Sequence, residues 1–293
     1  MTQSILNIGI LAHVDAGKTT ITEQILYQSG SQRTIGSVDK GTSSTDNLKV
    51  EQERGISVRL ATATFQYNGV KVNIIDTPGH VDFCAEVEYS LRALDAVVLV
   101  ISAVEGVQGH TISLFNAINE MNIQCLIFIN KIDRVGADVD AVLQDIRKTL
   151  TQKIIVLQKT DGETLISEWS EAKQNDEIVQ QLVEFDDELM ECYLEGEKID
   201  FETLDDLLAQ TTSETEFIPV ILGAAKNGVG ISKLLDALTR YFKFPTADKD
   251  RPLSSVIFKI EHDKLLVMKL FLGFLGASRT CASIVFSISG FIG

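Results

Sequence analysis

Apolar runs of five to seven residues alternate along the chain with stretches in which apolar residues recur every three or four positions. The runs have the length and β-branched content of buried strands, and the spaced residues have the period of amphipathic helices. This alternation predicts an α/β fold with a mainly parallel sheet that is covered on both faces. The predicted buried strands are 5–11, 70–75, 96–102, 124–130 and 218–222.

Turn and helix signals complete this pattern. Asn68 and Gly69 separate the alternating segment 58–67 from the next strand, and this pair is typical of a β-hairpin turn. Helical spacing of apolar residues predicts helices over 139–150 and 231–242.

Composition changes at three places and indicates the domain organisation. Residues 1–244 form the predicted α/β domain, which contains a helical insertion at about 151–217. A linker at 245–252 leads to residues 253–293, which we interpret as the start of a β-barrel domain, incomplete and with an atypical apolar tail. The insertion is expected to be a subdomain of its own. Its apolar stripe comprises Leu182, Val183, Leu189, Leu194, Leu204, Leu207 and Leu208.

Charged residues are distributed unevenly along the chain. The formal net charge of the 293 residues is −15, and residues 171–217 alone contain 16 Asp and Glu against two Lys. Elsewhere the charges nearly balance, so a uniformly basic surface that wraps DNA is excluded. The acidic segment is either a solvated helical face or a docking surface for a basic partner.

Cysteine spacing and the apolar tail bear on the cellular setting. The four cysteines are far apart and show neither zinc-site nor disulfide-framework spacing, so we expect a reducing, cytoplasmic setting. The uncharged stretches 270–278 and 280–293 are too short to span a membrane. We therefore expect no membrane partner and interpret the tail as an altered β module, with a membrane anchor as the alternative.

The first predicted strand leads into a sequence typical of a phosphate-binding loop. Gly17 lets backbone N–H groups turn toward phosphate oxygens, and the following helix presents its positive end to the same anion. Lys18 adds a charge for the β- and γ-phosphates, and the Thr19 hydroxyl can bind Mg²⁺. The strict pattern has Gly where this chain has Ala12, and a structural loop is the alternative. The loop comprises Ala12, His13, Val14, Asp15, Ala16, Gly17, Lys18, Thr19 and Thr20.

A second motif, Asp76, Thr77, Pro78, Gly79 and His80, follows the strand that starts at residue 70. A carboxylate at a strand end can hold Mg²⁺ through water, and the N–H of Gly79 can donate to a γ-phosphate. His80 lies where it could orient an attacking water. The alternative, a strand that ends in a Pro-Gly turn, does not account for Asp76 and His80.

A third motif, Asn130, Lys131, Ile132 and Asp133, bears on the choice of base. The Asp133 carboxylate can accept hydrogen bonds from N1–H and the 2-amino group of guanine, whereas adenine offers neither donor, so GTP is favoured over ATP. Asn130 is expected to tie this loop to the phosphate loop. The stem of Lys131 can lie along the plane of the base.

A fourth element, Gly223, Ala224, Ala225 and Lys226, follows the last strand of the α/β domain. We expect it to supply backbone N–H groups to guanine O6, with Lys226 packing over the base. A tight turn into the last helix is the alternative. All four elements follow predicted strands, and ligands of parallel sheets bind at the carboxyl ends of the strands.

Together with residues 52–57, these elements resemble the guanine-nucleotide domain of translational GTPases. The phosphate loop and residues 76–83 are similar to the elongation factor G group. Within that group, residues 71–76 and the short insertion before Gly223 are most similar to tetracycline-resistance ribosomal protection proteins. The resemblance covers about residues 1–262.

The resemblance implies a magnesium site. Thr19 and Ser57 would bind the ion directly, and Asp76 would hold it through water. The family usually has Thr at position 57, and Ser keeps the hydroxyl but loses the methyl group that stiffens the side chain. It usually has Ser where this chain has Ala224.

The resemblance also implies catalytic roles. Lys18 would bind the phosphates, and Asp15 would help to stabilise transition-state charge. His80 would place the hydrolytic water once the ribosome orders it, and Val14 and Ile56 would form the apolar gate that keeps His80 turned away beforehand. No arginine finger is evident in the chain, so intrinsic turnover is expected to be slow.

The implied function is a ribosome-dependent GTPase, a monomer that uses GTP as substrate and confers tetracycline resistance. The implied partner is the factor-binding site of the large ribosomal subunit, with its rRNA. One alternative is an elongation factor G-type translocation factor. Another is a truncated nucleotide-binding remnant, because the family continues through further domains that this sequence does not contain.

Overall fold

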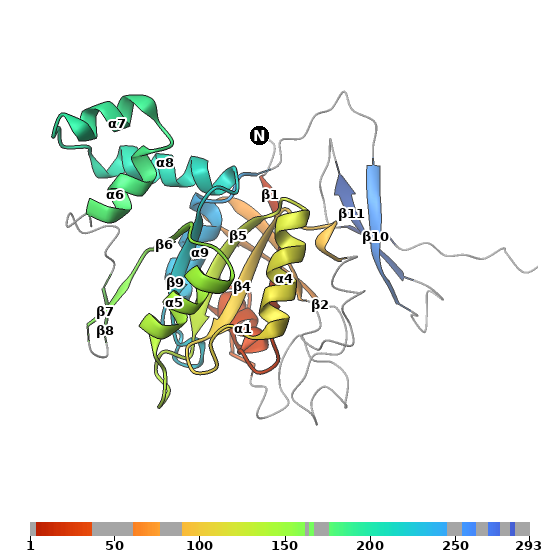
Figure 1. Cartoon of the computed structure of the whole chain (residues 1–293). Helices are drawn as coiled ribbons and strands as arrows, with labels where there is room; N and C mark the ends of the chain where they lie inside the picture. Colours follow the sequence, from red (N-terminus) through yellow and green to blue (C-terminus); the bar gives the residue numbers. More distant parts are fainter. Residues whose placement is uncertain are drawn as a thin grey trace, which may run out of the picture.

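The computed structural model describes residues 4–36, 61–76, 90–161, 164–166, 176–244, 254–261, 269–275 and 282–284. Figure 1 shows one central sheet flanked by helices, with three further helices, α6 to α8, grouped beside it.

The central sheet has seven strands in the order β2-β3-β1-β4-β5-β9-β6, and every neighbouring pair is parallel except β2 and β3. This confirms the predicted mainly parallel sheet. The predicted hairpin turn is also present, because Asn68 and Gly69 join β2 to β3 with φ of 47° and 78°. The strands are β1 (Ile5–Ala12), β2 (Ala61–Tyr67), β3 (Val70–Asp76), β4 (Ala96–Ser102), β5 (Gln124–Asn130), β6 (Ile154–Val156) and β9 (Ile218–Leu222).

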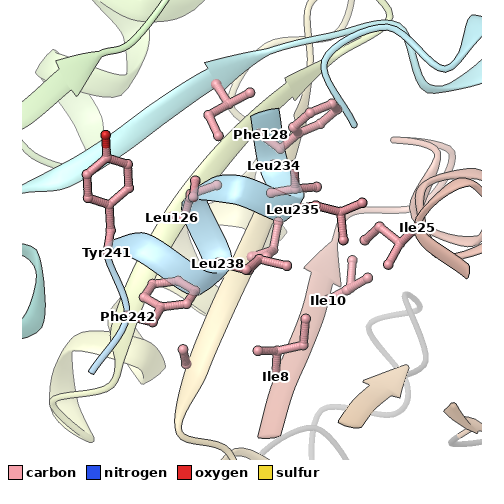
Figure 2. Close-up of a cluster of buried hydrophobic side chains, with 14 of the residues drawn as sticks. Ile8, Ile10, Ile25, Leu126, Phe128, Leu234, Leu235, Leu238, Tyr241 and Phe242 are labelled. Atoms are coloured by element: carbon pink, nitrogen blue, oxygen red, sulfur yellow. The ribbon is translucent and has the colours of Figure 1, made fainter. Parts of the chain in front are cut away.

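The helices that cover this sheet are α1 (Lys18–Gln28), α4 (Gly109–Glu120), α5 (Val139–Thr149) and α9 (Ile231–Arg240). Successive strand residues point to opposite faces. In β4, Val98 and Val100 belong to the buried cluster that includes α1 and α9, whereas Val97 and Leu99 belong to the cluster that includes α4 and α5. Figure 2 shows β1 and β5 side chains meeting those of α1 and α9. Burial on both faces explains why these strands are continuous apolar runs.

A row of polar side chains crosses the sheet away from its carboxyl edge. The Asn7 side chain donates to Asp95 Oδ2 at 3.0 Å and accepts from Asn73 Nδ2 at 2.9 Å, while Thr64 Oγ1 donates to Asn73 Oδ1 at 2.9 Å. Asn7, Asn73 and Thr64 are also direct register partners across β1, β3 and β2. A slip by one residue would leave buried amides unpaired, so the row fixes the register.

The insertion is not wholly helical, contrary to the sequence-based prediction. Its first part, β6, is the edge strand of the central sheet and runs parallel to β9. A three-residue strand is too short for its apolar residues to show a strand period. The rest consists of the hairpin β7 (Lys159–Asp161) and β8 (Thr164–Ile166) and the helices α6 (Asp176–Val183), α7 (Asp187–Leu194) and α8 (Phe201–Ser213).

The insertion has a small core of its own and also shares the core of the central domain. Leu182, Leu207 and Leu208 lie in the same buried cluster as β1, α1 and α9. A smaller cluster around Leu204 supports the helices themselves. Leu194 was predicted in this stripe but is 76% exposed, at the C-terminal end of α7.

Part of the acidic face is used inside the chain. The Arg240 guanidinium of α9 donates to Asp205 and Asp206 of α8, and the Tyr241 hydroxyl donates to Asp205 at 2.8 Å. These contacts raise the pKa of Arg240, since the neighbouring carboxylates stabilise its charged form. The acidic helix is therefore joined to the central domain by polar contacts as well as by leucines.

A second, three-stranded antiparallel sheet consists of β10 (Ser254–Glu261), β11 (Lys269–Leu275) and β12 (Ala282–Ile284). These strands agree with the predicted β character of residues 253–293, whereas the start of a barrel remains a prediction. Within the described ranges, no helix combines the length and apolarity needed to cross a membrane.

The shared core predicts how the insertion unfolds. Leu208→Ala should lower the free energy of unfolding by about 2–5 kcal/mol, because it removes a fully buried side chain from the common cluster. Leu194→Ala is the matched control and should change it by less than about 0.5 kcal/mol. Both variants of the full chain are unfolded with urea and followed by circular dichroism. The α/β domain and its insertion should unfold together in one transition. A separate early transition in Leu208→Ala would mean that the insertion unfolds on its own.

Candidate nucleotide-binding site

The predicted elements gather at one edge of the sheet. The strands β1, β3 and β5 end at Ala12, Asp76 and Asn130, and Gly223 directly follows β9. Because β1, β3, β5 and β9 run in the same direction, their carboxyl ends meet at this edge. Ser57 and residues 77–80 lie outside the described residues.

The phosphate loop is built on two residues with left-handed backbone. Asp15 has a φ of 65° and Gly17 has a φ of 96°, and the Ala16 N–H donates to the His13 carbonyl at 3.3 Å. The helix α1 begins directly afterwards, and Gly17, at its N-cap position, offers no side chain to cap it. The first N–H groups of a helix lack intrahelical partners and carry partial positive charge. The loop can therefore receive an anion, with Lys18 in its first turn.

Asn130 ties three segments together. Its side-chain Nδ2 donates to the Ala16 carbonyl at 2.8 Å, and its Oδ1 accepts from the Ala225 N–H at 2.9 Å. The residue is only 3% exposed. The predicted contact between Asn130 and the phosphate loop is thus confirmed, and the same amide also holds the loop after β9.

Close packing explains two glycines of the site. A Cβ atom at Gly17 would lie 2.4 Å from Asn130 Nδ2. At Gly223 it would lie 2.3 Å from Phe128 Cζ and 2.6 Å from the Val229 carbonyl oxygen. Both positions therefore need glycine for space, and Gly17 needs it also for its backbone conformation.

The loop 223–226 differs from the sequence-based expectation. We expected its N–H groups to serve guanine O6, but those of Gly223, Ala224 and Ala225 donate within the protein, to Ile129 O, Val229 O and Asn130 Oδ1. A sequence pattern identifies the turn but does not show which way its N–H groups point. The N–H of Gly223 continues the ladder between β5 and β9, so its direction is set by the sheet.

The loop after β5 contains one residue with a left-handed backbone and one hydrogen-bonded carboxylate. Lys131 has a φ of 67°, a left-handed backbone that is uncommon outside glycine. Asp133 Oδ2 accepts from Asn227 Nδ2 at 2.9 Å. The sequence analysis did not single out Asn227, although it directly follows the fourth motif. The loops after β5 and β9 are thus connected where the base is expected.

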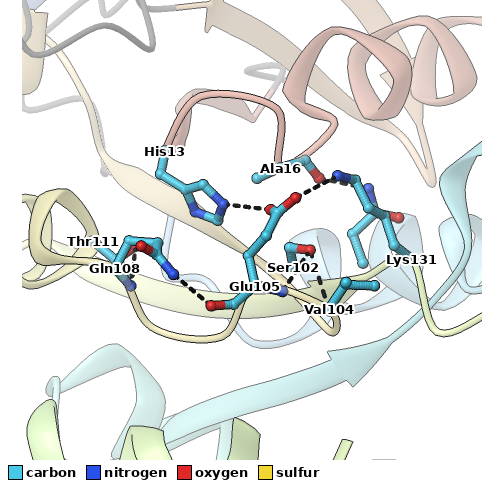
Figure 3. A network of polar contacts seen from close by, with 9 residues as sticks. His13, Ala16, Ser102, Val104, Glu105, Gln108, Thr111 and Lys131 are labelled. Carbon is cyan, nitrogen blue, oxygen red and sulfur yellow. Dashed lines mark hydrogen bonds and ion pairs between the residues drawn. The ribbon is translucent and has the colours of Figure 1, made fainter. Parts of the chain in front are cut away.

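Glu105 is a second residue that the sequence analysis missed. Its carboxylate lies between His13, with Nε2 to Oε2 at 2.9 Å, and Lys131, with Nζ to Oε1 at 3.3 Å (Figure 3). Burial raises the pKa of Glu105, but the hydrogen bond with His13 and the charge of Lys131 outweigh this effect and leave the pKa below its usual value. The sequence offered one indication of this residue: Glu105 lies three residues after β4, which also ends at this edge of the sheet.

This fold and the loop between β1 and α1 define a P-loop nucleotide-binding protein. The chain belongs to the family described as the elongation factor Tu GTP-binding domain, whose model matches residues 3–244. The predicted class, a GTPase domain of the translational type, is thereby confirmed.

Individual relatives agree with this assignment. The chain is 43% identical to the tetracycline resistance protein TetP of Clostridium perfringens over 92% of its own length and 43% of that protein's length. It is 43% identical to TetW of Butyrivibrio fibrisolvens over 95% and 44% of the respective lengths. The crystal structure of ttk003000868 from Thermus thermophilus matches with a TM-score of 0.83 at 26% identity, over 93% of this chain and 46% of that one. The chain thus spans less than half of each relative.

The steric role of Gly17 can be tested with a matched control. Gly17→Ala should lower GDP affinity at least about tenfold, because the new methyl group would displace the Asn130 side chain that holds Ala16. Gly30 also has a positive φ, of 77°, but open space around it, so Gly30→Ala carries only the backbone strain of about 1–2 kcal/mol. Calorimetric titration with GDP, together with melting temperatures, separates the two effects. Equal GDP affinity in both variants would contradict the steric role.

Proposed function

We propose that this chain binds GTP with Mg²⁺ and hydrolyses it to GDP and phosphate in a ribosome-dependent manner. The observation that carries the proposal is the double hydrogen bond of Asn130, which joins the phosphate loop to the loop after β9. We propose that this contact sets the spacing between the phosphate and base ends of one bound nucleotide.

The proposed contacts with the nucleotide follow from the loops. The N–H groups of the phosphate loop and Lys18 would bind the β- and γ-phosphates, and Asp133 would accept from guanine while Lys131 covers the base. The N–H groups of Gly223, Ala224 and Ala225 donate within the protein. We therefore propose that Lys226, the remaining residue of this loop, donates the hydrogen bond to guanine O6.

The residues at the carboxyl edge suit Mg²⁺. Thr19 lies in the first turn of α1, and Asp76 is the register partner of Ile10 at the end of the neighbouring strand. Hydroxyl and carboxylate oxygens are the ligands that Mg²⁺ prefers. We propose that Thr19 and Ser57 bind the ion and that Asp76 holds it through water. The bound ion would neutralise charge on the β- and γ-phosphates.

The hydrolytic step would depend on positioning and charge. We propose that His80 orients the attacking water, that Asp15 and Lys18 help to stabilise the transition state, and that Val14 and Ile56 gate His80. These roles come from the family resemblance. Water attacks the γ-phosphorus, the bond to the β–γ bridging oxygen breaks, and GDP is the leaving group.

The ribosome and tetracycline enter through the relatives. We propose that the chain acts as a monomer in the cytoplasm, at the factor-binding site of the large subunit and its rRNA, and that it protects ribosomes from tetracycline. The support is the 43% identity to TetP and TetW over more than 90% of this chain. A translocation factor and a nucleotide-binding remnant are the competing functions.

One experiment separates these functions. GTP turnover by the purified chain is measured with and without ribosomes, and a GDP titration serves as the folding control. Stimulation by ribosomes, together with release of bound tetracycline from them, is the expected result. Stimulation with tRNA translocation but no drug release would favour the translocation factor. Tight GDP binding without stimulation would identify a remnant, and absence of GDP binding would refute the proposal altogether.

The base-reading role of Asp133 makes a specific prediction. Asp133→Asn should lower guanine nucleotide affinity about 10- to 100-fold and shift the preference toward xanthine nucleotides, because an amide can donate to the 2-oxo group of xanthine. Asp140→Asn makes the same charge change on the first turn of α5 and should leave both affinities unchanged. Competition between GDP and XDP measures the preference. Retained guanine preference would remove Asp133 from this role.

A further inference from the structure

One carboxylate connects two loops that the proposed function assigns to opposite ends of the nucleotide. His13 belongs to the phosphate loop and Lys131 to the base loop. Oε2 of Glu105 contacts His13, and Oε1 contacts Lys131. We propose that Glu105 is a positioning residue that restrains these two loops and thereby slows the release of guanine nucleotides. This inference rests on the proposed nucleotide binding.

The backbone around Glu105 is fixed, unlike that of an ordinary surface glutamate. The Ser102 hydroxyl accepts from the N–H groups of Val104 and Glu105, each at 3.3 Å, and the Gly106 N–H donates to the Ser102 carbonyl at 2.9 Å. The Gln108 side chain donates to the Glu105 carbonyl. Ser102 is the buried last residue of β4, so this turn places the Glu105 carboxylate relative to the sheet.

The contact with His13 is a defined hydrogen bond. An ionised Glu105 carboxylate can only accept a hydrogen bond, so we assign His13 Nε2 as the donor. His13 is 9% exposed, and within the described part of the chain its Nδ1 is buried without a hydrogen-bond partner. Glu105 is thus the side chain that fixes the orientation of the imidazole at the start of the phosphate loop.

The contact with Lys131 acts on the other loop. Lys131 has a left-handed backbone, and its ammonium Nζ lies 3.3 Å from Oε1 of the Glu105 carboxylate. The Lys131 stem would be aligned before the base arrives, so less conformational entropy would be lost on binding. The side chains of Glu105 and Lys131 are 38% and 23% exposed, so the ion pair alone is partly screened.

The test measures dissociation of fluorescent GDP from the full chain. Glu105→Gln should release GDP about three- to tenfold faster, because an amide replaces one of the two acceptor oxygens by an N–H donor that faces His13 or Lys131. Glu105→Asp, which keeps the charge but is one methylene shorter, should fall between Gln and the parent. Glu120→Gln makes the same charge change on the exposed end of α4 and should behave as the parent.

A double-mutant cycle distinguishes positioning from plain stabilisation. Lys131→Met keeps the apolar stem without the ammonium, so adding Glu105→Gln to it should accelerate release less than Glu105→Gln does in the parent. Full additivity would overturn the Lys131 half of the proposal. If Glu105→Gln lowers the melting temperature but leaves the rate of GDP release unchanged, the whole proposal is overturned. If the parent itself binds no GDP, the proposed function fails and not merely this inference.

Discussion

The two hydrogen bonds of the buried Asn130 amide are the constraint on which the site depends. They require that β5 ends level with the phosphate loop and with the loop after β9. They also require glycine at position 17, since any Cβ there would occupy the space of the amide. The register of the strands supplies the first condition, and the polar row through Asn7 and Asn73 secures that register between β1 and β3.

The core and the site are therefore parts of one structure. The alternate residues of β4 and its neighbours supply two buried layers, and α1, which presents its first turn to the site, is held in one of them by Ile21 and Ile25. Leucines of α6 and α8 join the same layer. Whatever loosens the insertion thus also acts on the helix that would bind phosphate.

The sequence alone predicts what is periodic or forced by a turn. The strands 96–102, 124–130 and 218–222 were found with their bounds, because burial on both faces leaves continuous apolar runs. The three-residue strand β6 was missed because it is too short to show a period. Glu105 and Asn227 were missed because they lie outside the recognised motifs and their partners are 92 and 94 residues away. The direction of the N–H groups at 223–225 could not be predicted, because the sheet partner Ile129, the Asn130 amide and the Val229 carbonyl set it.

Charge is segregated in a way that lets an acidic chain bind an anion. The 16 acidic residues of 171–217 dominate the net charge of −15, and Asp205 and Asp206 of this segment are paired with Arg240. At the carboxyl edge, the start of α1 provides partial positive charge where Lys18 already lies. The Glu105 carboxylate, which is bound to the phosphate loop, is paired with both His13 and Lys131. Since a paired carboxylate repels a neighbouring phosphate less than a bare one does, this pairing makes Glu105 compatible with nucleotide binding at this edge.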